Sequence, residues 1–248
     1  MMLDVQDVSL SFGGLQAVAD VTFSIGEGEI VALIGPNGAG KTTLFSLISG
    51  FLHPDAGRIR FDGRDITDRE PHEIAALGLV RTFQITQPFA HLTVAENIAV
   101  GAHLRLRSRS DALRQAAMVA ERVGLAGRLD QPAESLTVAG RKRLELARAL
   151  ATGPRLLLLD EVMAGLNPRE IDEIVPIIRA IRDGGVTVLL TEHVMRAVMQ
   201  LSDRALVLND GRLIAEGAPR AIAEDPRVIE AYLGAGAARR ILAEAAHG

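Results

Sequence analysis

Residues 35–43 read GPNGAGKTT, and their types and spacing are those of a loop that binds phosphate. They match the pattern G-x-x-x-x-G-K-[ST] and follow the apolar run 30–34, the strand that such a loop requires. Glycines let backbone N–H groups surround an anion, and the N-terminus of the next helix adds partial positive charge. Lys41 is expected to reach the terminal phosphates, and Thr42 to offer Mg²⁺ a hydroxyl. The residues expected to contact nucleotide are Gly35, Pro36, Asn37, Gly38, Ala39, Gly40, Lys41, Thr42 and Thr43.

A glycine-rich turn without a ligand is the alternative interpretation of this run. Five constrained positions in the required context make it the weaker one. The sequence therefore predicts that the chain binds a nucleoside triphosphate.

Two acids at the end of a second apolar run add the possibility of hydrolysis. The run 156–159 is followed by Asp160 and Glu161. Asp160 is expected to deliver a carboxylate to Mg²⁺ next to Thr42. Glu161 is expected to act as general base toward the attacking water. A strand that ends in two solvated acids is the common alternative, and the phosphate loop upstream disfavours it.

A histidine and a glutamine follow two further apolar runs. Ligands of open α/β sheets lie beyond the carboxyl ends of the strands, so His193 and Asp160 are expected to face the same phosphate. A lone histidine is more often a surface residue, and only its position here favours a role. Gln84 follows the predicted strand 79–83, where its amide could touch Mg²⁺ or the water. By itself Gln84 would carry no weight.

The elements that must position these residues are predicted from periodicity and turn residues. The first sixty residues indicate four short strands, and residues 93–150 indicate mainly helices, the first opened by the capping box Thr93–Glu96 and ended at Gly101. Continuous apolar runs such as 155–160 and 186–190 are typical of a parallel sheet buried on both faces. The strands expected in the first part are 3–10, 18–25, 30–34 and 58–61, with a helix over 41–49; later elements are a hairpin around 209–211 and a last helix from 225 to about 234.

Composition narrows the class of protein. A chain of 248 residues with 48% hydrophobic and 23% charged residues suits one large α/β domain, or a core with a sizeable insertion. The absence of cysteine excludes disulfides, thiolate metal sites and cysteine nucleophiles. A net charge of −4 argues against a general nucleic-acid binder. Neither a signal peptide nor an apolar run of the ~20 residues that cross a bilayer is evident. Any work at a membrane is therefore expected from the cytoplasmic side, through a partner.

Taken together, these motifs resemble the nucleotide-binding subunit of an ATP-binding cassette (ABC) transporter over nearly the full length. By this similarity 35–43 is Walker A, Gln84 is the Q-loop glutamine, Asp160-Glu161 ends Walker B, 164–168 is the D-loop and His193 is the switch histidine. Phe12 lies where the family places an aromatic ring against adenine, although a core residue on the first strand is the alternative. The nucleotide implied is ATP, with Mg²⁺.

Longer runs resemble the ATPases of branched-chain amino-acid importers. They are GPNGAGKTTLF, RTFQ at 81–84, LTVAENIAVG at 92–101, DEVMAGLNP at 160–168, and the closing GAPRAIAEDPRVIEAYLG. The resemblance implies a RecA-like P-loop core with an N-terminal antiparallel β subdomain (1–88 and 153–217), an inserted helical subdomain (about 89–152), an ABC ATPase domain over 1–234, and C-terminal helices and tail over 218–248. It also implies a peripheral protein on the cytoplasmic face of the inner membrane.

The partners that the resemblance implies are a second, different ABC ATPase subunit that forms a heterodimer with this chain, two membrane permeases and, indirectly, a periplasmic binding protein. Nucleic acid is not expected as a partner. The permease's coupling helix is expected to dock in the groove after Gln84, through about Gly101. Importers of urea or short amides and lipopolysaccharide-type exporters use related ATPases and remain alternatives. The acidic net charge disfavours a soluble ABC ATPase that acts on ribosomes or nucleic acid. The presence of Glu161 and His193 disfavours a regulator that binds ATP without hydrolysing it.

The sequence departs from the family at the signature LSGGQ, which here reads Leu-Thr-Val-Ala-Gly over 136–140. Thr137 keeps a hydroxyl donor, whereas Val138 and Ala139 add Cβ atoms where glycines allow close approach. Thr137 and Gly140 are expected to contact ATP held by the other subunit. Walker A and B are complete while the signature is weakened, so the two composite sites are predicted to be unequal. A basic stretch at 105–114 is either a solvated helix face or a contact with anionic lipid headgroups.

Overall fold

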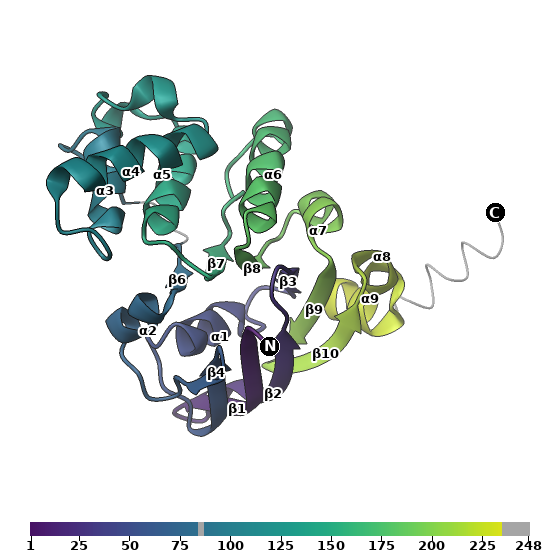
Figure 1. Ribbon diagram of the computed structural model, residues 1–248. Coiled ribbons are helices and arrows are strands. Elements are labelled where there is room, and N and C mark those ends of the chain that lie inside the picture. Colours follow the sequence, from purple (N-terminus) through teal and green to yellow (C-terminus); the bar gives the residue numbers. More distant parts are fainter. Residues whose placement is uncertain (84–86, 235–248) are drawn as a thin grey trace, which may run out of the picture.

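The computed structural model describes residues 1–83 and 87–234 (Figure 1). Gln84 and the tail 235–248 lie outside the described residues, so the predictions made for them stay predictions. Within the described ranges no helix combines the length and the apolar character needed to cross a membrane.

Two β-sheets form the body of the molecule. The first is antiparallel with the order β2-β1-β4-β5, and the second has the order β10-β9-β3-β8-β7-β6. In the second sheet all neighbouring strands are parallel except β10, which pairs with β9 as a hairpin. The strands are β1 Leu3–Phe12, β2 Leu15–Ile25, β3 Ile30–Ile34, β4 Ala56–Phe61, β5 Arg64–Asp65, β6 Leu79–Arg81, β7 Leu156–Asp160, β8 Thr187–Thr191, β9 Arg204–Asn209 and β10 Arg212–Gly217.

Some of the α-helices pack against the parallel sheet, and three others form a separate group on one side of it. Helices α3, α4 and α5 pack on one another and connect to the core through β6 and β7 (Figure 1). The helices are α1 Lys41–Ile48, α2 Pro71–Leu77, α3 Val94–Ala102, α4 Arg109–Arg122, α5 Val138–Ala151, α6 Pro168–Asp183, α7 Met195–Leu201, α8 Pro219–Glu224 and α9 Pro226–Leu233. The predicted fold class is confirmed: an α/β core carries an antiparallel N-terminal sheet and an inserted helical group. The exact domain limits stay predictions.

The parallel sheet is buried on both faces, as its continuous apolar runs predicted. Along β3, Ile30, Ala32 and Ile34 belong to one hydrophobic cluster. The alternate residues Val31 and Leu33 belong to the other. Successive side chains of a strand point to opposite faces, so each strand of this type contributes to two cores. The sheet is thereby fixed in position, and its carboxyl ends form a rigid edge.

Several predicted boundaries were wrong by one to three residues, such as the start of β2, which is Leu15 rather than residue 18. Two of them coincide with a tertiary contact. Helix α3 continues one residue beyond Gly101, which lies inside it where a Cβ would meet the Arg148 carbonyl oxygen at 2.1 Å. Strand β6 ends at Arg81 rather than Phe83. The Phe83 N–H leaves the sheet and donates to the Glu145 carboxylate on α5, at 2.6 Å. The predicted start of α3 is correct, since the capping box at Thr93 opens this helix. A capping box at Asn167 likewise opens α6.

Candidate active site

The loop between β3 and α1 is held closely against neighbouring backbone. A Cβ on Gly35 would lie 2.0 Å from the Leu208 carbonyl oxygen, and one on Gly40 would lie 2.4 Å from that of Ala17. Gly35 has φ +151° and Gly40 φ +102°, conformations that L side chains rarely adopt. Glycine is therefore required at both positions, and the course of the loop is fixed by β9 and β2.

Lys41, the first residue of α1, turns its side chain back over this loop. Its Nζ donates to the carbonyl oxygens of Gly35 at 2.7 Å and Pro36 at 2.9 Å. Burial lowers the pKa of Lys41, and the negative charges of Glu161 and Asp160 oppose that shift. The amine is thus held where an anion bound by the loop would meet it.

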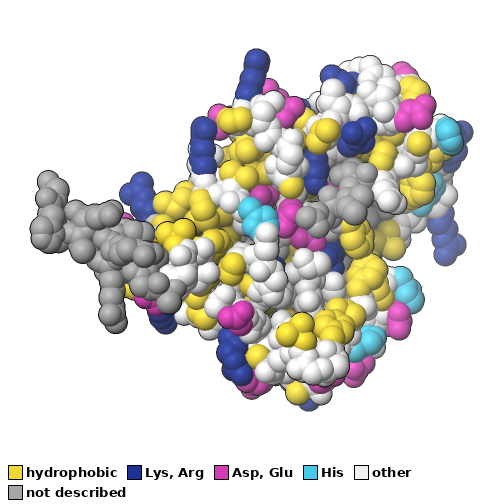
Figure 2. All heavy atoms as spheres, turned by 180° about the vertical axis from the view of Figure 1, so that it is seen from behind, with side chains coloured by type: hydrophobic (Ala, Val, Ile, Leu, Met, Phe, Trp, Pro, Cys, Tyr) yellow, Lys and Arg dark blue, Asp and Glu magenta, His cyan; other side chains and the backbone are white. Residues whose placement is uncertain are grey.

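A hollow of about 410 Å³ opens beside the loop, a volume typical of small-molecule sites. It brings Phe12, Lys41, Glu161 and His193 to one place, although they are far apart in sequence. Phe12 is 50% exposed, so its ring is available to a flat ligand instead of being a core residue. Figure 2 shows acidic and histidine side chains lying together on one face of the molecule. The lining residues are Phe12, Leu15, Gln16, Ala17, Asn37, Gly38, Ala39, Gly40, Lys41, Thr42, Thr43, Glu161, His193, Asp210 and Gly211.

Glu161 and His193 contact each other at this hollow. The His193 Nε2 lies 2.6 Å from the Glu161 Oε1. Glu161 adopts φ +49°, an uncommon conformation for a residue with a side chain, immediately after β7. Its N–H donates to the carbonyl oxygen of Thr191, at 3.1 Å, and to the Thr191 Oγ1, at 3.2 Å. Strained backbone of this kind concentrates at functional sites, where surrounding contacts hold it in place.

Asp160 ends β7 as a buried carboxylate with both oxygens engaged. The Thr191 hydroxyl donates to its Oδ1 at 2.8 Å, and Arg81 Nη2 donates to its Oδ2 at 2.7 Å. Among the described residues no group of three or more acids or histidines is placed to hold a metal alone. Mg²⁺ commonly takes one or two protein oxygens and completes its shell with water and phosphate. Asp160 and the Thr42 hydroxyl are hard oxygen donors of this kind, so the residues present suit Mg²⁺ beside a triphosphate.

Thr137 and Gly140 are not brought to the phosphate loop. The Thr137 Oγ1 accepts the N–H of Gly140 at 3.2 Å and so caps α5. Both residues line a different hollow, of about 340 Å³, which they share with Asn167. Asn167 caps α6 by accepting the N–H of Glu170 at 3.0 Å. The signature residues therefore line a hollow separate from that of Lys41.

Two residues around the site, Glu192 and Arg81, were not assigned from the sequence. Glu192 is 2% exposed, and its Oε1 accepts the Met163 N–H at 2.9 Å. Burial raises the pKa of Glu192 to about 7. Lys142, also buried, donates from Nζ to the Glu161 carbonyl oxygen at 3.2 Å. Arg81 holds Asp160 from the next strand. A usable signal exists, because charged residues are rarely buried without a partner or a role, and Arg81 and Glu192 both adjoin apolar strands.

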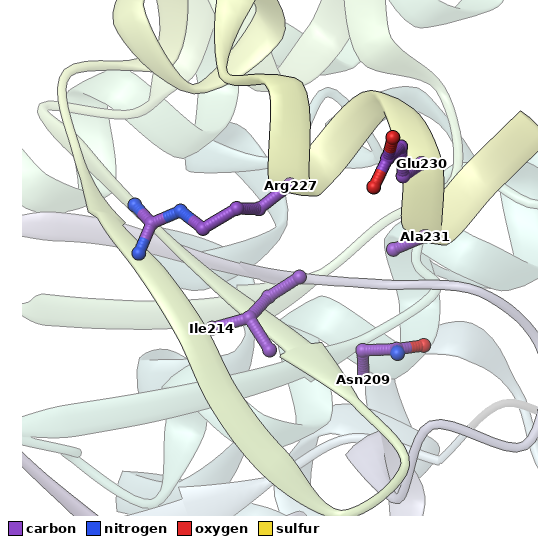
Figure 3. Close-up of a pocket in the computed structure, with 5 residues that line it drawn as sticks. All are labelled: Asn209, Ile214, Arg227, Glu230 and Ala231. Carbon is purple, nitrogen blue, oxygen red and sulfur yellow. The ribbon is translucent and has the colours of Figure 1, made fainter. Parts of the chain in front are cut away.

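The C-terminal helix α9 borders another hollow, and the β9–β10 hairpin on its other side touches the phosphate loop. This hollow, of about 520 Å³, lies between the β9–β10 hairpin and α9 (Figure 3). Arg227 and Glu230 approach it from α9, and Asn209 and Ile214 from the hairpin. Burial raises the pKa of Tyr232 on α9. The Gly211 N–H of the hairpin donates to the Ala39 carbonyl oxygen in the phosphate loop at 3.0 Å. The loop thus has a neighbour in the C-terminal part of the chain.

Comparison with known proteins gives two matching family models. The model described as "ABC transporter" matches residues 18–164. A second, described as "Branched-chain amino acid ATP-binding cassette transporter", matches residues 212–238, which include α9.

Individual relatives match over nearly the whole chain. The chain is 42% identical to the high-affinity branched-chain amino acid transport ATP-binding protein BraF of Pseudomonas aeruginosa, over 94% of this chain and 98% of that protein. It is 39% identical to the lipopolysaccharide export system ATP-binding protein LptB of Acidithiobacillus ferridurans, over 94% and 97%. Among solved structures, the ADP conformation of MJ1267, an ATP-binding cassette of an ABC transporter, has a TM-score of 0.86 and 33% identity, covering 94% of this chain and 98% of that one.

Proposed function

Because this chain belongs to the ABC transporter family, we propose that it is the ATP-hydrolysing subunit of an importer for branched-chain amino acids. The observation that carries hydrolysis is the Glu161–His193 contact of 2.6 Å, which opens on the same hollow as Lys41. The cargo is supported by the similarity to BraF and by the family model over 212–238. An exporter ATPase is the second candidate, because LptB is nearly as similar.

The residues divide the work of phosphoryl transfer to water. Loop N–H groups and Lys41 stabilise negative charge on the phosphates, and Phe12 offers a ring to adenine. Glu161 orients the attacking water and accepts its proton. His193 contacts Glu161 and is expected to detect the terminal phosphate of bound ATP. Bound Mg²⁺ would neutralise phosphate charge. Thr42 and Asp160 are the residues that would hold it, with Gln84 predicted to assist.

The proposed assembly contains a second ABC ATPase subunit, two membrane permeases and, indirectly, a periplasmic binding protein. Thr137 and Gly140 would contact ATP bound to the second subunit. A groove of about 210 Å³ between β6 and the helical group supports permease docking, since Phe83 and Val100 line it and are exposed. The protein would then act at the cytoplasmic face of the inner membrane as a peripheral subunit.

Nucleotide binding by the purified chain, and turnover after assembly with its partner subunits, test the ATPase part. Glu161→Gln is expected to retain ATP binding and to lower hydrolysis at least about a hundredfold, the usual scale for a lost general base. Lys41→Ala is expected to weaken ATP binding itself. Glu134→Gln changes an exposed acid outside the hollow and serves as the matched control. Equal hydrolysis by Glu161→Gln and wild type would contradict the proposal.

Uptake measurements test the cargo. The chain would be co-reconstituted with the permeases, second ATPase and binding protein encoded beside its gene, and labelled leucine and urea would be offered separately. We expect ATP-dependent uptake of leucine that Lys41→Ala abolishes. Uptake of urea alone would move the assignment to the amide importers. Neighbouring genes of an export system would favour the second candidate.

A further inference from the structure

Arg81 carries a buried positive charge at the end of β6, directly beside the proposed magnesium ligands. Its side chain is 6% exposed, and that of its partner Asp160 is 5% exposed. Arg81 Nη2 lies 2.7 Å from the Asp160 Oδ2. The role of the pair needs a separate explanation, because buried ion pairs contribute little net stability once desolvation is counted.

The second terminal nitrogen of the same guanidinium is connected to Thr42 through Ser46. Arg81 Nη1 donates to the Ser46 Oγ at 2.9 Å. The Ser46 hydroxyl in turn donates to the Thr42 carbonyl oxygen at 2.8 Å. One planar group thereby joins the Asp160 side chain on β7 to the first turn of α1, where Thr42 lies.

Two aromatic rings restrict the orientation of this guanidinium. Its Cζ lies 5.7 Å from the centre of the Phe45 ring and 5.3 Å from that of Phe83, within the range of cation–π attraction. Within residues 1–83 and 87–234, Arg81 Nε is one of two buried side-chain nitrogen or oxygen atoms without a hydrogen-bond partner. The protein tolerates this loss while both Nη atoms keep their partners. This arrangement is expected if the two Nη atoms have to be held in fixed positions.

We propose that Arg81 is a positioning residue of the ATP site, which holds the Asp160 carboxylate and the Thr42 turn at the separation that Mg²⁺ requires. The inference rests on the proposed function, since it concerns the metal that accompanies ATP. Groups that orient metal ligands typically change metal affinity 10- to 100-fold when they are removed. The planar fork of arginine can serve two acceptors in fixed directions, whereas the amine of lysine is a point charge.

The test measures the Mg²⁺ dependence of ATP binding by the full-length purified chain. A fluorescent ATP analogue would be titrated at a series of Mg²⁺ concentrations and also in EDTA. For Arg81→Lys and Arg81→Met we expect the half-saturating Mg²⁺ concentration to rise about tenfold or more. The affinity in EDTA is expected to stay within about twofold of wild type, because Arg81 does not line the nucleotide hollow.

Three further variants make the result specific. Ser46→Ala breaks the link to Thr42 and is expected to shift the Mg²⁺ requirement in the same direction by a smaller factor. Arg155→Gln is the matched control, since Arg155 bonds Asp62 and lies over the Phe61 ring at 5.9 Å, outside the ATP site. It is expected to leave the Mg²⁺ requirement unchanged. If Arg81→Met fails to fold, Arg81→Lys and Ser46→Ala decide the outcome.

The possible failures are distinguishable. If Arg81→Lys has the Mg²⁺ requirement of wild type, the guanidinium only neutralises Asp160 and the proposal is overturned. A lower requirement in Arg81→Met would overturn it in the same way, since it would mean that Arg81 competes with the metal. If wild type itself does not bind ATP, the proposed function fails along with this inference.

Discussion

At the scale of single residues, Glu192 is a buried carboxyl group next to the proposed switch residue His193. Burial raises the pKa of Glu192 to about 7, the negative charge of Glu161 adds to the shift, and Lys142 opposes it. In the unfolded chain the same group titrates near 4.5. The native state therefore binds more protons between these values, and its stability falls as pH rises through that window.

Glu192→Gln is expected to remove this pH dependence. A glutamine can still accept the Met163 N–H through its amide oxygen and carries no charge, so the variant should be more stable than wild type at pH 8, by up to about 3 kcal/mol. Near pH 4.5 the two should be alike. Urea unfolding at both pH values measures the difference, with exposed Glu224→Gln as the control. A variant less stable than wild type at pH 8 would show that the ionised carboxylate is stabilising.

At the scale of elements, the contact between α3 and α5 determines how closely the helical group packs. Gly101 lies in α3, where a Cβ would meet the Arg148 carbonyl oxygen of α5 at 2.1 Å. Gly101→Ala forces the two helices apart and is expected to cost about 3 kcal/mol of unfolding free energy. Gly127→Ala is the control, because a Cβ there meets nothing within 4 Å.

Urea unfolding measures this loss of stability. ATP binding shows whether the substitution also affects the nucleotide site. Binding is expected to survive in Gly101→Ala under native conditions, because neither α3 nor α5 lines the nucleotide hollow. A variant as stable as wild type would mean that the helices separate without loss, and the close α3–α5 contact would then not be needed for stability.

What the sequence predicted well depends on local patterns. The pattern of the phosphate loop directly follows its strand, and the capping box at Thr93 lies within a few residues of the partners it needs. Arg81 was passed over although it lies in a run that was singled out. Its partner Asp160 is 79 residues away in sequence, and no local period indicates such a pair. Gly101 was misassigned as a helix end for the same reason, since the α5 backbone that requires it is a tertiary neighbour.

At the scale of the whole molecule, two separate hollows carry the two halves of the proposed ATP site. One contains Lys41, Glu161 and His193, and the other contains Thr137 and Gly140. Because the two halves line separate hollows of one chain, we expect each site to be completed by a second subunit. If that subunit is a different protein, the two composite sites need not be equal.

The two halves of the proposed ATP site differ in how closely their residues match the motifs of the family. The Walker residues are all present, whereas the signature carries Val138, 47% exposed, and Ala139 where glycines would allow close approach. The Thr137 Oγ1 is already used in capping α5. We therefore expect the site that uses this chain's Glu161 to carry more of the turnover than the site that uses its Thr137.

In the assembled transporter, Lys41→Ala and Glu161→Gln are expected to lower ATP turnover about a hundredfold or more, and Thr137→Ala less than about tenfold. Thr137→Ala also removes a helix cap, which typically costs about 1 kcal/mol. Ser108→Ala removes the corresponding cap of α4 and corrects for that effect. Steady-state ATPase rates in proteoliposomes with all partners present give the comparison. If Thr137→Ala lowers turnover as far as Glu161→Gln while Ser108→Ala does not, the weakened signature is fully functional and the asymmetry is wrong.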